Sequence, residues 1–332
     1  MIFPLLAGFA AAVVFAMIFI PFLRAVKAGQ PIKKIGPVWH MKKEGTPTMG
    51  GWIFIVGTAS GCAVFALLNP AADIKPILAI FIFALVYAVI GFIDDIKKIT
   101  KRSNDGLSGF AKLLLQLAAA LALILLLRYL GYLTPNLYIP FAEVTIPLPE
   151  LAYEIFATFV IVGTVNAVNI TDGVDGVLTG VTLPVAACFS ALAFAWGSVG
   201  IGGFGIALVG GLFGFLCFNF NPAKVFMGDT GSLFLGGAIA ATAFALDAPL
   251  ALVPLCLIYI WEVLSDIIQV IWFKYTKRKY KEGRRVFKMA PFHHHLEKSG
   301  WSEKKIFLVF TIFSVICAAA TYYIMFERYG KL

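Results

Sequence analysis

Long apolar segments recur along the whole chain, and they restrict what it can fold into. The chain has 332 residues, of which 60% are hydrophobic and 14% are charged, whereas about a quarter of the residues of a soluble domain are charged. Runs of about 20 apolar residues can each cross a bilayer core about 30 Å thick. Ten such spans are predicted, at residues 2–23, 49–68, 76–93, 111–130, 151–168, 177–196, 200–218, 232–247, 249–265 and 305–326. The chain is therefore predicted to be an all-α polytopic integral membrane protein with about ten transmembrane helices, as a single transmembrane domain over residues 1–332.

The distribution of lysine and arginine predicts how these spans are oriented. With ten spans, 23 of the 27 basic residues fall on one side. Because cytoplasmic loops carry an excess of basic residues, that side is predicted to be cytoplasmic and both termini extracytoplasmic. The predicted cytoplasmic loops lie at about residues 24–47, 94–112, 166–176, 219–231 and 274–305.

Four polar stretches fall at the predicted cytoplasmic ends of spans or in cytoplasmic loops. They are GFIDDIKK at 91–98, NAVNITDGVDG at 166–176, NFNPAKVFMGDTGS at 219–232 and MAPFHHHLE at 289–297. Segments far apart in the sequence are thus expected to meet on one face of the membrane. This arrangement is typical of a membrane enzyme whose site lies at the boundary between water and lipid.

The residue types in these stretches suit a metal ion and a phosphorylated ligand. Mg²⁺ prefers carboxylate oxygens together with substrate phosphates, and the candidates are Asp94, Asp95, Asp172, Asp175 and Asp229. Amide side chains can hold a diphosphate or a sugar, lysines can neutralise phosphate charge, and a ring such as Phe226 offers a stacking face for a base. Taken singly, the paired aspartates also fit a solvated helix end, and NITDGVDG fits a tight turn.

Two further features concern the chain after residue 260. Glu262 and Asp266 are four residues apart, so they share a helix face. Either the ninth span bends so that both face an aqueous cavity, or the span ends early and residues 265–281 form an amphipathic interfacial helix. The basic run from Lys274 to Lys288 is interpreted as an anchor for anionic lipids.

Five motifs together resemble those of one family of membrane enzymes. They are HMKKEGTPTMGG at 40–51, GFIDD at 91–95, NAVNITDGVDG at 166–176, FNPAKVFMGDTGS at 220–232 and PFHHHLE at 291–297. The chain resembles, over its whole length, the MraY family of bacterial phospho-N-acetylmuramoyl-pentapeptide transferases. This family belongs to the wider polyprenyl-phosphate N-acetylhexosamine-1-phosphate transferases, and PFHHHLE is specific to the muramoyl branch.

The resemblance implies an Mg²⁺-dependent transfer of phospho-MurNAc-pentapeptide from UDP-MurNAc-pentapeptide to undecaprenyl phosphate. The products are lipid I and UMP, and this is the first membrane step of peptidoglycan synthesis. The enzyme is then a homodimer in the bacterial inner (plasma) membrane, in contact with membrane lipids and with no nucleic-acid partner. The implied catalytic residues are Asp94, Asp95, Asp229, His293, His294 and His295, with Asp229 as the metal ligand. The predicted substrate-binding residues are Lys43, Thr48, Lys98, Asn166, Asn169, Asp172, Asp175, Asn219, Phe226 and Gln269.

Other functions and two mechanisms stay open at the level of sequence. A UDP-GlcNAc:polyprenyl-phosphate GlcNAc-1-phosphate transferase would share the aspartate motifs. A secondary transporter would place its polar site near the bilayer midplane, often between inverted repeats, whereas the motif carboxylates lie at one predicted interface. For the transferase, the acceptor phosphate can attack the donor directly, or an aspartate can first take the phospho-sugar covalently.

Overall fold

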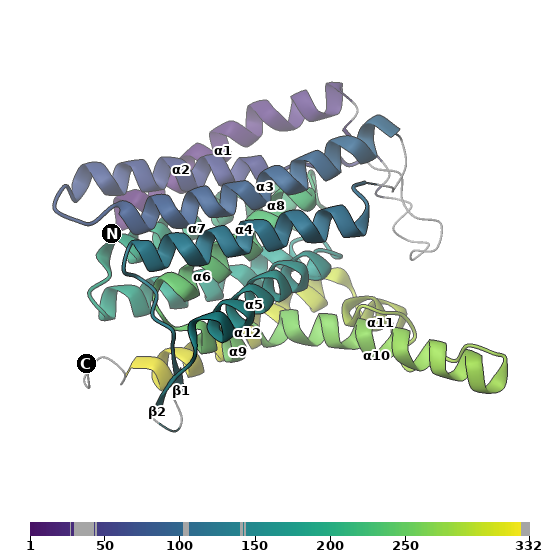
Figure 1. Ribbon diagram of the computed structural model, residues 1–332. Helices are drawn as coiled ribbons and strands as arrows, with labels where there is room; N and C mark the ends of the chain where they lie inside the picture. Colours follow the sequence, from purple (N-terminus) through teal and green to yellow (C-terminus); the bar gives the residue numbers. More distant parts are fainter. Residues whose placement is uncertain are drawn as a thin grey trace.

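The computed structural model describes residues 1–26, 28–29, 43, 45–101, 106–139, 142 and 144–326. Most of the first predicted loop, 24–47, lies outside these described residues. The helices, shown in Figure 1, are α1 (Ile2–Ala25), α2 (Gly51–Leu68), α3 (Lys75–Lys101), α4 (Gly109–Tyr129), α5 (Glu150–Thr171), α6 (Val177–Ala195), α7 (Val199–Asn219), α8 (Gly228–Ala245), α9 (Leu252–Leu255), α10 (Leu257–Tyr280), α11 (Phe292–Lys298) and α12 (Glu303–Phe326). A 3₁₀ helix, η2 (Pro249–Ala251), precedes α9, and β1 (Asn136–Ile139) pairs with β2 (Val144–Pro147) in an antiparallel hairpin.

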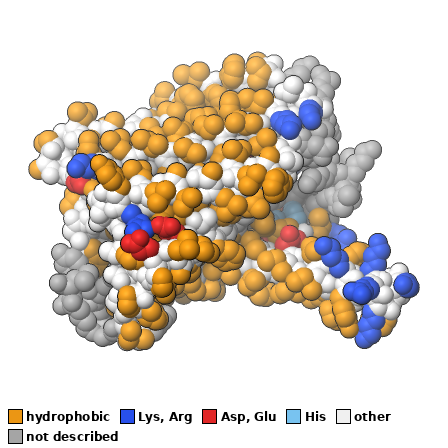
Figure 2. All heavy atoms as spheres, viewed as in Figure 1, with side chains coloured by type: hydrophobic (Ala, Val, Ile, Leu, Met, Phe, Trp, Pro, Cys, Tyr) orange, Lys and Arg blue, Asp and Glu red, His pale blue; other side chains and the backbone are white. Residues whose placement is uncertain are grey.

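Helices occupy all ten predicted spans, and the all-α membrane architecture is confirmed. Among the described residues, eight helices are long and apolar enough to cross a membrane, and the bent segment from Pro249 to Tyr280 makes a possible ninth. Helix α8 occupies the remaining predicted span. The outer surface of the bundle is largely apolar (Figure 2), as expected where lipid replaces water.

Helix α8 lies at the centre of the bundle and begins with the motif that carries Asp229. Every residue from Thr230 to Ala245 is buried, so this helix contacts protein on all sides. It packs most extensively against α3, and also against α5 and α2. Gly91 of α3 makes this approach possible, because a side chain there would overlap the backbone of Asp229. The close packing of α3 and α8 brings their aspartates together.

The ninth span bends, as one of the two predicted alternatives had it. It breaks at Cys256, and the segments on either side of the break make an angle of 75°. Helix α10 then continues without interruption to Tyr280 and projects from the bundle (Figure 1). The predicted separate interfacial helix over residues 265–281 is therefore part of one long helix, and the predicted loop at 274–305 contains the end of α10 and all of α11.

Two helices run further than their predicted spans. Helix α3 continues to Lys101, so Asp94 and Asp95 lie inside the helix instead of ending it. Helix α5 continues to Thr171, which places Asn166 and Asn169 on its last turns. The polar motifs thus project from rigid helices, which hold side chains more firmly than loops do.

The start of α1 and the end of α12 lie at the same end of the bundle, and the β hairpin lies beside the end of α12 (Figure 1). The end of α3 and the tip of α10 lie at the opposite end. This arrangement is consistent with an even number of crossings.

Candidate active site

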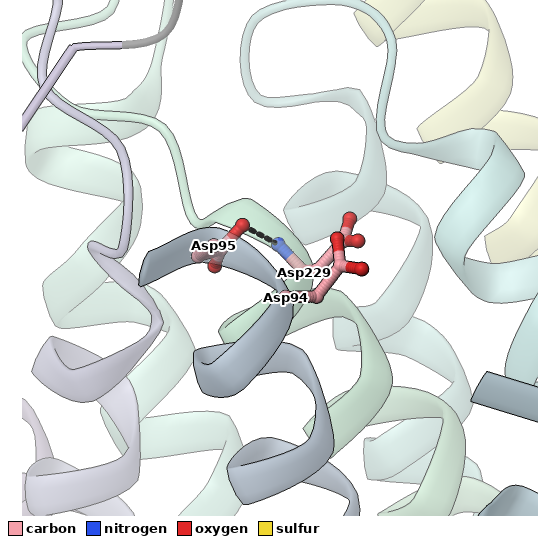
Figure 3. Close-up of side chains that lie close together, drawn as sticks. All are labelled: Asp94, Asp95 and Asp229. Carbon is pink, nitrogen blue, oxygen red and sulfur yellow. Dashed lines mark hydrogen bonds between the residues drawn. The ribbon is translucent and has the colours of Figure 1, made fainter. Parts of the chain in front are cut away.

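Three aspartates meet where α3 packs against the start of α8. Asp94, Asp95 and Asp229 each offer a carboxylate oxygen, and these oxygens lie within 4.8 Å of one another. Figure 3 shows the carboxyl groups of Asp94 and Asp229 side by side, while that of Asp95 points toward the backbone of Asp229. The adjacent aspartates of α3 therefore point in different directions, as expected for neighbours about 100° apart around a helix.

Asp95 holds the start of α8 in place. Its carboxylate accepts hydrogen bonds from the backbone N–H of Asp229 at 3.2 Å and from Thr230, through the N–H at 2.9 Å and the hydroxyl at 2.7 Å. A negative charge at a helix N-terminus is favourable, because the first N–H groups lack partners in the helix and the helix dipole is positive there. With an exposed fraction of 0%, Asp95 acts in this geometry mainly by positioning Asp229.

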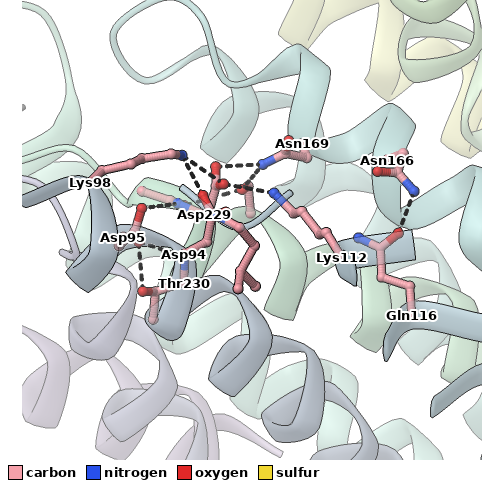
Figure 4. A network of polar contacts seen from close by, with 12 residues as sticks. Asp94, Asp95, Lys98, Lys112, Gln116, Asn166, Asn169, Asp229 and Thr230 are labelled. Carbon is pink, nitrogen blue, oxygen red and sulfur yellow. Dashed lines mark hydrogen bonds and ion pairs between the residues drawn. The ribbon is translucent and has the colours of Figure 1, made fainter. Parts of the chain in front are cut away.

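Two lysines contact Asp229 from opposite sides (Figure 4). Its Oδ2 atom lies 2.9 Å from Nζ of Lys98 and 2.7 Å from Nζ of Lys112. Lys98 also contacts Asp94 at 2.6 Å, in an i,i+4 ion pair along α3. The opposite oxygen of Asp94 accepts a hydrogen bond from the N–H of Leu107 at 2.7 Å. Positive and negative groups alternate here within one partly buried cluster.

The donor set of this cluster fits a hard divalent cation. Carboxylate oxygens are the ligands that Mg²⁺ prefers, and Mg²⁺ usually takes only one or two of them. Asp94 and Asp229 present such oxygens side by side, and the ammonium groups of Lys98 and Lys112 contact the same atoms. The oxygens of Asp95 are bonded to the first residues of α8, whereas Asp94 and Asp229 contact lysine side chains, whose positive charge a divalent cation can replace. Asp94 and Asp229 are therefore the better-placed ligands.

The end of α5 and the turn that follows it form the next wall of the site. Asn169 donates from Nδ2 to Oδ1 of Asp229 at 3.0 Å and to the hydroxyl of Ser232 at 2.7 Å. Asp172 lies in the turn, where burial, followed by the nearby carboxylates of Asp229 and Asp95, raises its pKa to about 8. Asn166 donates to Oε1 of Gln116 at 2.7 Å, so its amide nitrogen is used inside the protein.

A second polar network ties this turn to other elements. Asp175 accepts hydrogen bonds from Lys43 at 2.6 Å, from the side chain of Asn221 at 3.2 Å and from the N–H of Ala223 at 2.9 Å. Glu303, at the start of α12, contacts the same Lys43 at 2.6 Å and the same asparagine at 3.2 Å. Lys43 and Asp175 thus join four segments of the chain, and their contacts are with protein.

Three predicted substrate ligands lie in, or pack against, the chain between the end of α7 and the start of α8. Asn219 is buried and uses both ends of its amide, accepting from the hydroxyl of Thr179 at 2.9 Å and donating to the carbonyl of Val225 at 3.1 Å. Phe226 is half-buried and pairs through its backbone with Pro47 and Gly50. Thr48 is buried next to Gly228, where α8 begins. Of the three, the ring of Phe226 remains the most accessible to a ligand.

The histidine motif lies on α11 and is held by α10. Oε2 of Glu262 lies 2.9 Å from Nδ1 of His293, and Oε1 accepts from the His293 N–H at 3.1 Å. Both residues are buried, with exposed fractions of 0% and 1%. The contact with His293 explains why the apolar part of α10 contains a carboxylate. The Glu262 side chain is buried against this histidine and does not face the predicted aqueous cavity.

His293 packs against the turn that carries Asp172. A side chain added at Gly173 would overlap the imidazole at Nε2, so only glycine lets the two segments approach this closely. Nε2 is buried and has no hydrogen-bond partner in the structure. The histidine helix therefore packs against the turn that follows α5, and α5 also carries Asn169, which contacts the aspartate cluster.

The other two histidines and Gln269 stabilise the local fold. His294 contacts Glu297 at 2.6 Å, and Nδ1 of His295 accepts from the N–H of Lys288 at 3.1 Å. Gln269 accepts at Oε1 from the N–H groups of Val286 and Phe287, both at 3.0 Å. The predicted nucleoside contact of Gln269 stays a prediction, because this side chain fastens the returning chain to α10.

Several residues that contact the predicted site were not among its predicted members. They include Lys112, Thr230, Glu262 and Glu303, whose contacts appear above. Thr230 lies inside the polar stretch at 219–232, and Glu262 stands out in the sequence as a carboxylate within an apolar span. Lys112 and Glu303 lie at the starts of helices, where charged residues are too common to be diagnostic.

Comparison with known proteins identifies the family. A family model described as glycosyl transferase family 4 matches residues 77–247, and phospho-N-acetylmuramoyl-pentapeptide-transferase signature 1 matches residues 43–55. The phospho-N-acetylmuramoyl-pentapeptide-transferase of Clostridium acetobutylicum is 43% identical over 319 residues, which cover 95% of this chain and 96% of that protein. The protein of the same name from Staphylococcus carnosus is 40% identical over 311 residues, covering 93% and 94%. A chain with these motifs, this family match and this similarity over nearly its full length belongs to the phospho-N-acetylmuramoyl-pentapeptide-transferase family.

Proposed function

We propose that this protein transfers phospho-MurNAc-pentapeptide from UDP-MurNAc-pentapeptide to undecaprenyl phosphate, forming lipid I and UMP. The observation that carries the proposal is the pairing of the Asp94 and Asp229 carboxylates with Lys98 and Lys112 at one end of an apolar bundle. A soluble donor and a lipidic acceptor can meet only where a polar site borders the membrane. We place this end at the cytoplasmic face of the bacterial plasma membrane, in agreement with the distribution of basic residues.

The transfer needs positioning and charge neutralisation more than covalent help from the protein. An oxygen of the acceptor phosphate attacks the sugar-linked phosphorus of the donor. The bond from that phosphorus to the bridging oxygen breaks, and UMP leaves with the electron pair. A phosphate monoester is mostly dianionic at pH 7, since its second pKa is about 6. Direct attack therefore needs little assistance, and Asp94 is placed to orient the acceptor or remove its last proton.

The residues around the cluster divide the remaining tasks. The ammonium groups of Lys98 and Lys112 lie at the Asp94 and Asp229 carboxylates, where the diphosphate would bind. Both lysines are therefore positioned to contact phosphate oxygens. Bound Mg²⁺, held by Asp229 and Asp94, would supply additional positive charge at the diphosphate. Asn169 orients Asp229, and Phe226 offers its ring to the nucleoside.

Two apolar grooves border the site and can hold the polyprenyl chain. One has a volume of about 260 Å³ and lies between α5 and the bent segment, from Phe156 and Gly163 to Ala167. The other has a volume of about 520 Å³ and lies between α1, α2 and α3, lined among others by Phe92 and Ile96. We favour the groove along α5, because Gly163 and Ala167 line it on one helix face, and that face continues at i+4 to Thr171, directly before the turn that carries Asp172.

Matched substitutions distinguish the two grooves. A side chain at Gly163 would meet open space, so Gly163→Leu fills the α5 groove without a clash. We expect this change to raise KM for undecaprenyl phosphate and to leave KM for the UDP donor unchanged. Ile96→Trp fills the other groove and should change neither constant. The opposite pattern would place the acceptor between α1, α2 and α3.

A lipid I synthesis assay tests the proposed function. Purified protein in detergent is given undecaprenyl phosphate, Mg²⁺ and radiolabelled UDP-MurNAc-pentapeptide or UDP-GlcNAc. We expect label from the first donor alone in the lipid phase, with one UMP released per lipid formed and no product in excess EDTA. Label transferred from UDP-GlcNAc alone would assign the chain to the related GlcNAc-1-phosphate transferases.

Orientation and oligomeric state belong to the same proposal and have separate tests. We propose a homodimer with both termini outside the cytoplasm, as the family resemblance and the basic residues indicate. A cysteine in place of His294 should react with a membrane-impermeant thiol reagent only after cells are opened. Mass photometry of the protein in nanodiscs should give twice the mass of one chain, and a single-chain mass would contradict the dimer.

A further inference from the structure

The outer half of α10 and the chain that returns beside it form an arm, comprising residues 267–291. The helix has 24 residues, so at 1.5 Å per residue it is about 36 Å long. It leaves the bundle after the 75° bend and extends into open space at the lower right of Figure 1. The side chains of Ile271 and Trp272 are 63% and 42% exposed, so they do not pack against the apolar surface of the bundle.

The returning chain is fastened to the helix at several points. Thr276 is fully buried and accepts at its hydroxyl from the N–H of Arg284 at 2.9 Å. Gln269 accepts from two further N–H groups, as described above, and Gly283 packs against the ring of Phe273. The arm is therefore an ordered helix and return segment with a defined tip, and not an irregular basic loop.

The tip carries a strong and uncompensated positive charge. Eight lysines and arginines lie between Lys274 and Lys288, with Glu282 as the single acidic residue. In the described part of the chain, none of the eight forms a salt bridge with a carboxylate. Two of them, Lys279 and Arg284, instead lie over the ring of Tyr280. Figure 2 shows this basic cluster at the tip, with apolar side chains between it and the bundle.

We infer that the arm lies in the membrane surface and binds anionic phospholipid headgroups at its tip. Exposed apolar residues along the helix suit the acyl chains, while tyrosine and tryptophan prefer the headgroup level. A cluster of this size next to a membrane attracts anionic lipids. The phosphates of the UDP donor are not the expected ligand, because the tip lies far along the arm from the lysines of the aspartate cluster (Figure 1).

The arm is continuous with the histidine helix. Helix α10 carries Glu262, which holds His293, and Lys288 donates its N–H to His295. Lipid bound at the tip therefore keeps α10 and the returning chain in the orientation that presents α11 to the site. The inference goes beyond the proposed transferase function. Lipid binding can be measured whether or not the protein is a transferase, whereas the effect of lipid on activity rests on the proposed function.

Lipid retention in native mass spectrometry tests the inference. The test variant is Lys277→Gln/Arg278→Gln/Lys279→Gln/Lys281→Gln, all at the tip. The matched control is Arg24→Gln/Lys101→Gln/Lys304→Gln/Lys305→Gln, which removes the same charge from exposed ends of other helices. Each protein is mixed with equal amounts of phosphatidylglycerol and phosphatidylcholine. Size-exclusion profiles and thermal unfolding establish that all three proteins are folded.

We expect the native protein and the control to retain more phosphatidylglycerol than phosphatidylcholine. In the tip variant, the ratio of retained phosphatidylglycerol to phosphatidylcholine should be about tenfold lower. Soluble glycerol phosphate should not displace the lipid, whereas displacement would indicate a site for free phosphate. Equal retention by the tip variant and the native protein would overturn the inference, as would an equal loss in the control. In nanodiscs, anionic lipid should raise transferase turnover of the native protein and not of the tip variant. If lipid binding changes as expected but no protein makes lipid I, the proposed function fails and the lipid site stands.

Discussion

The aspartate cluster and the histidine helix are built in contrasting ways. The aspartates project from α3 and α8, two helices inside the bundle, and Asp95 is bonded to backbone and hydroxyl groups of α8. The histidines lie on the seven-residue helix α11, which is attached through Glu262 to the start of the projecting α10. Helix packing therefore holds the first region, and a few buried polar contacts hold the second. This difference predicts that the aspartate region tolerates changes in its surroundings, whereas the histidine region responds to single contacts and to the membrane.

The largest effect is expected for Asp229→Asn. The change removes a charge from the site and leaves α8 buried, so turnover should fall about a thousandfold while the protein stays folded. Turnover is measured in the lipid I assay at saturating Mg²⁺, and folding is measured by thermal unfolding. Glu282→Gln, which removes a charge at the tip of the arm, is the control and should retain native turnover. Near-native turnover of Asp229→Asn would remove this residue from the metal site.

The next effect concerns Asp94 and distinguishes the two mechanisms. Asp94→Asn should lower turnover about a hundredfold at pH 6 and leave binding of the UDP donor intact. If Asp94 deprotonates the acceptor, the loss shrinks as pH rises to 8, because the acceptor phosphate, with a second pKa of about 6, is then already dianionic.

A covalent mechanism predicts a different result for the same variant. The loss would persist at every pH, and the native enzyme would release UMP without acceptor lipid. A phospho-sugar trapped on Asp94 or Asp95, detected by mass spectrometry, would contradict direct attack.

The histidine region is tested by Glu262→Gln beside Glu262→Ala. The glutamine can still accept from the His293 N–H but no longer gives the imidazole a carboxylate partner, so turnover should fall about tenfold. The alanine also leaves that buried N–H unpaired, which should cost about 1–3 kcal/mol in the free energy of unfolding. Imidazole nitrogen NMR shifts of His293 should change in both variants. Unchanged shifts together with reduced turnover would mean that Glu262 acts through packing alone.

The smallest effect is expected for Thr230→Val. It removes the hydroxyl donor to Asp95 at 2.7 Å but retains the two backbone N–H donors. Unfolding free energy should fall by about 1 kcal/mol, and turnover should change less than for Glu262→Gln. A loss of turnover as large as that of Asp229→Asn would show that packing holds the aspartate region less firmly than proposed.

Hydropathy and motif spacing predicted a helix in each of the ten spans and the meeting of the polar stretches. A bend in the ninth span was one of two predicted alternatives, but its position at Cys256 was not predicted, because this residue lies inside a continuous apolar run. They placed Asp94 and Asp95 at a helix end, although the helix continues through a basic segment to Lys101. Partners such as Lys112 for Asp229 depend on how α3, α4 and α8 pack, which a single sequence does not specify. From the sequence, a buried amide such as Asn219 cannot be distinguished from one that binds substrate. Its hydrogen bonds to other parts of the protein become visible only in the folded structure.

Manganese binding followed by electron paramagnetic resonance tests the central claim, that Asp94 and Asp229 form a metal site between α3 and α8. Mn²⁺ replaces Mg²⁺ at oxygen ligands, and its free form is counted directly. The account predicts saturable binding to the native protein, competition by Mg²⁺, strong weakening in Asp229→Asn and unchanged affinity in Glu262→Gln. Native affinity in Asp229→Asn, with the protein folded, would contradict it.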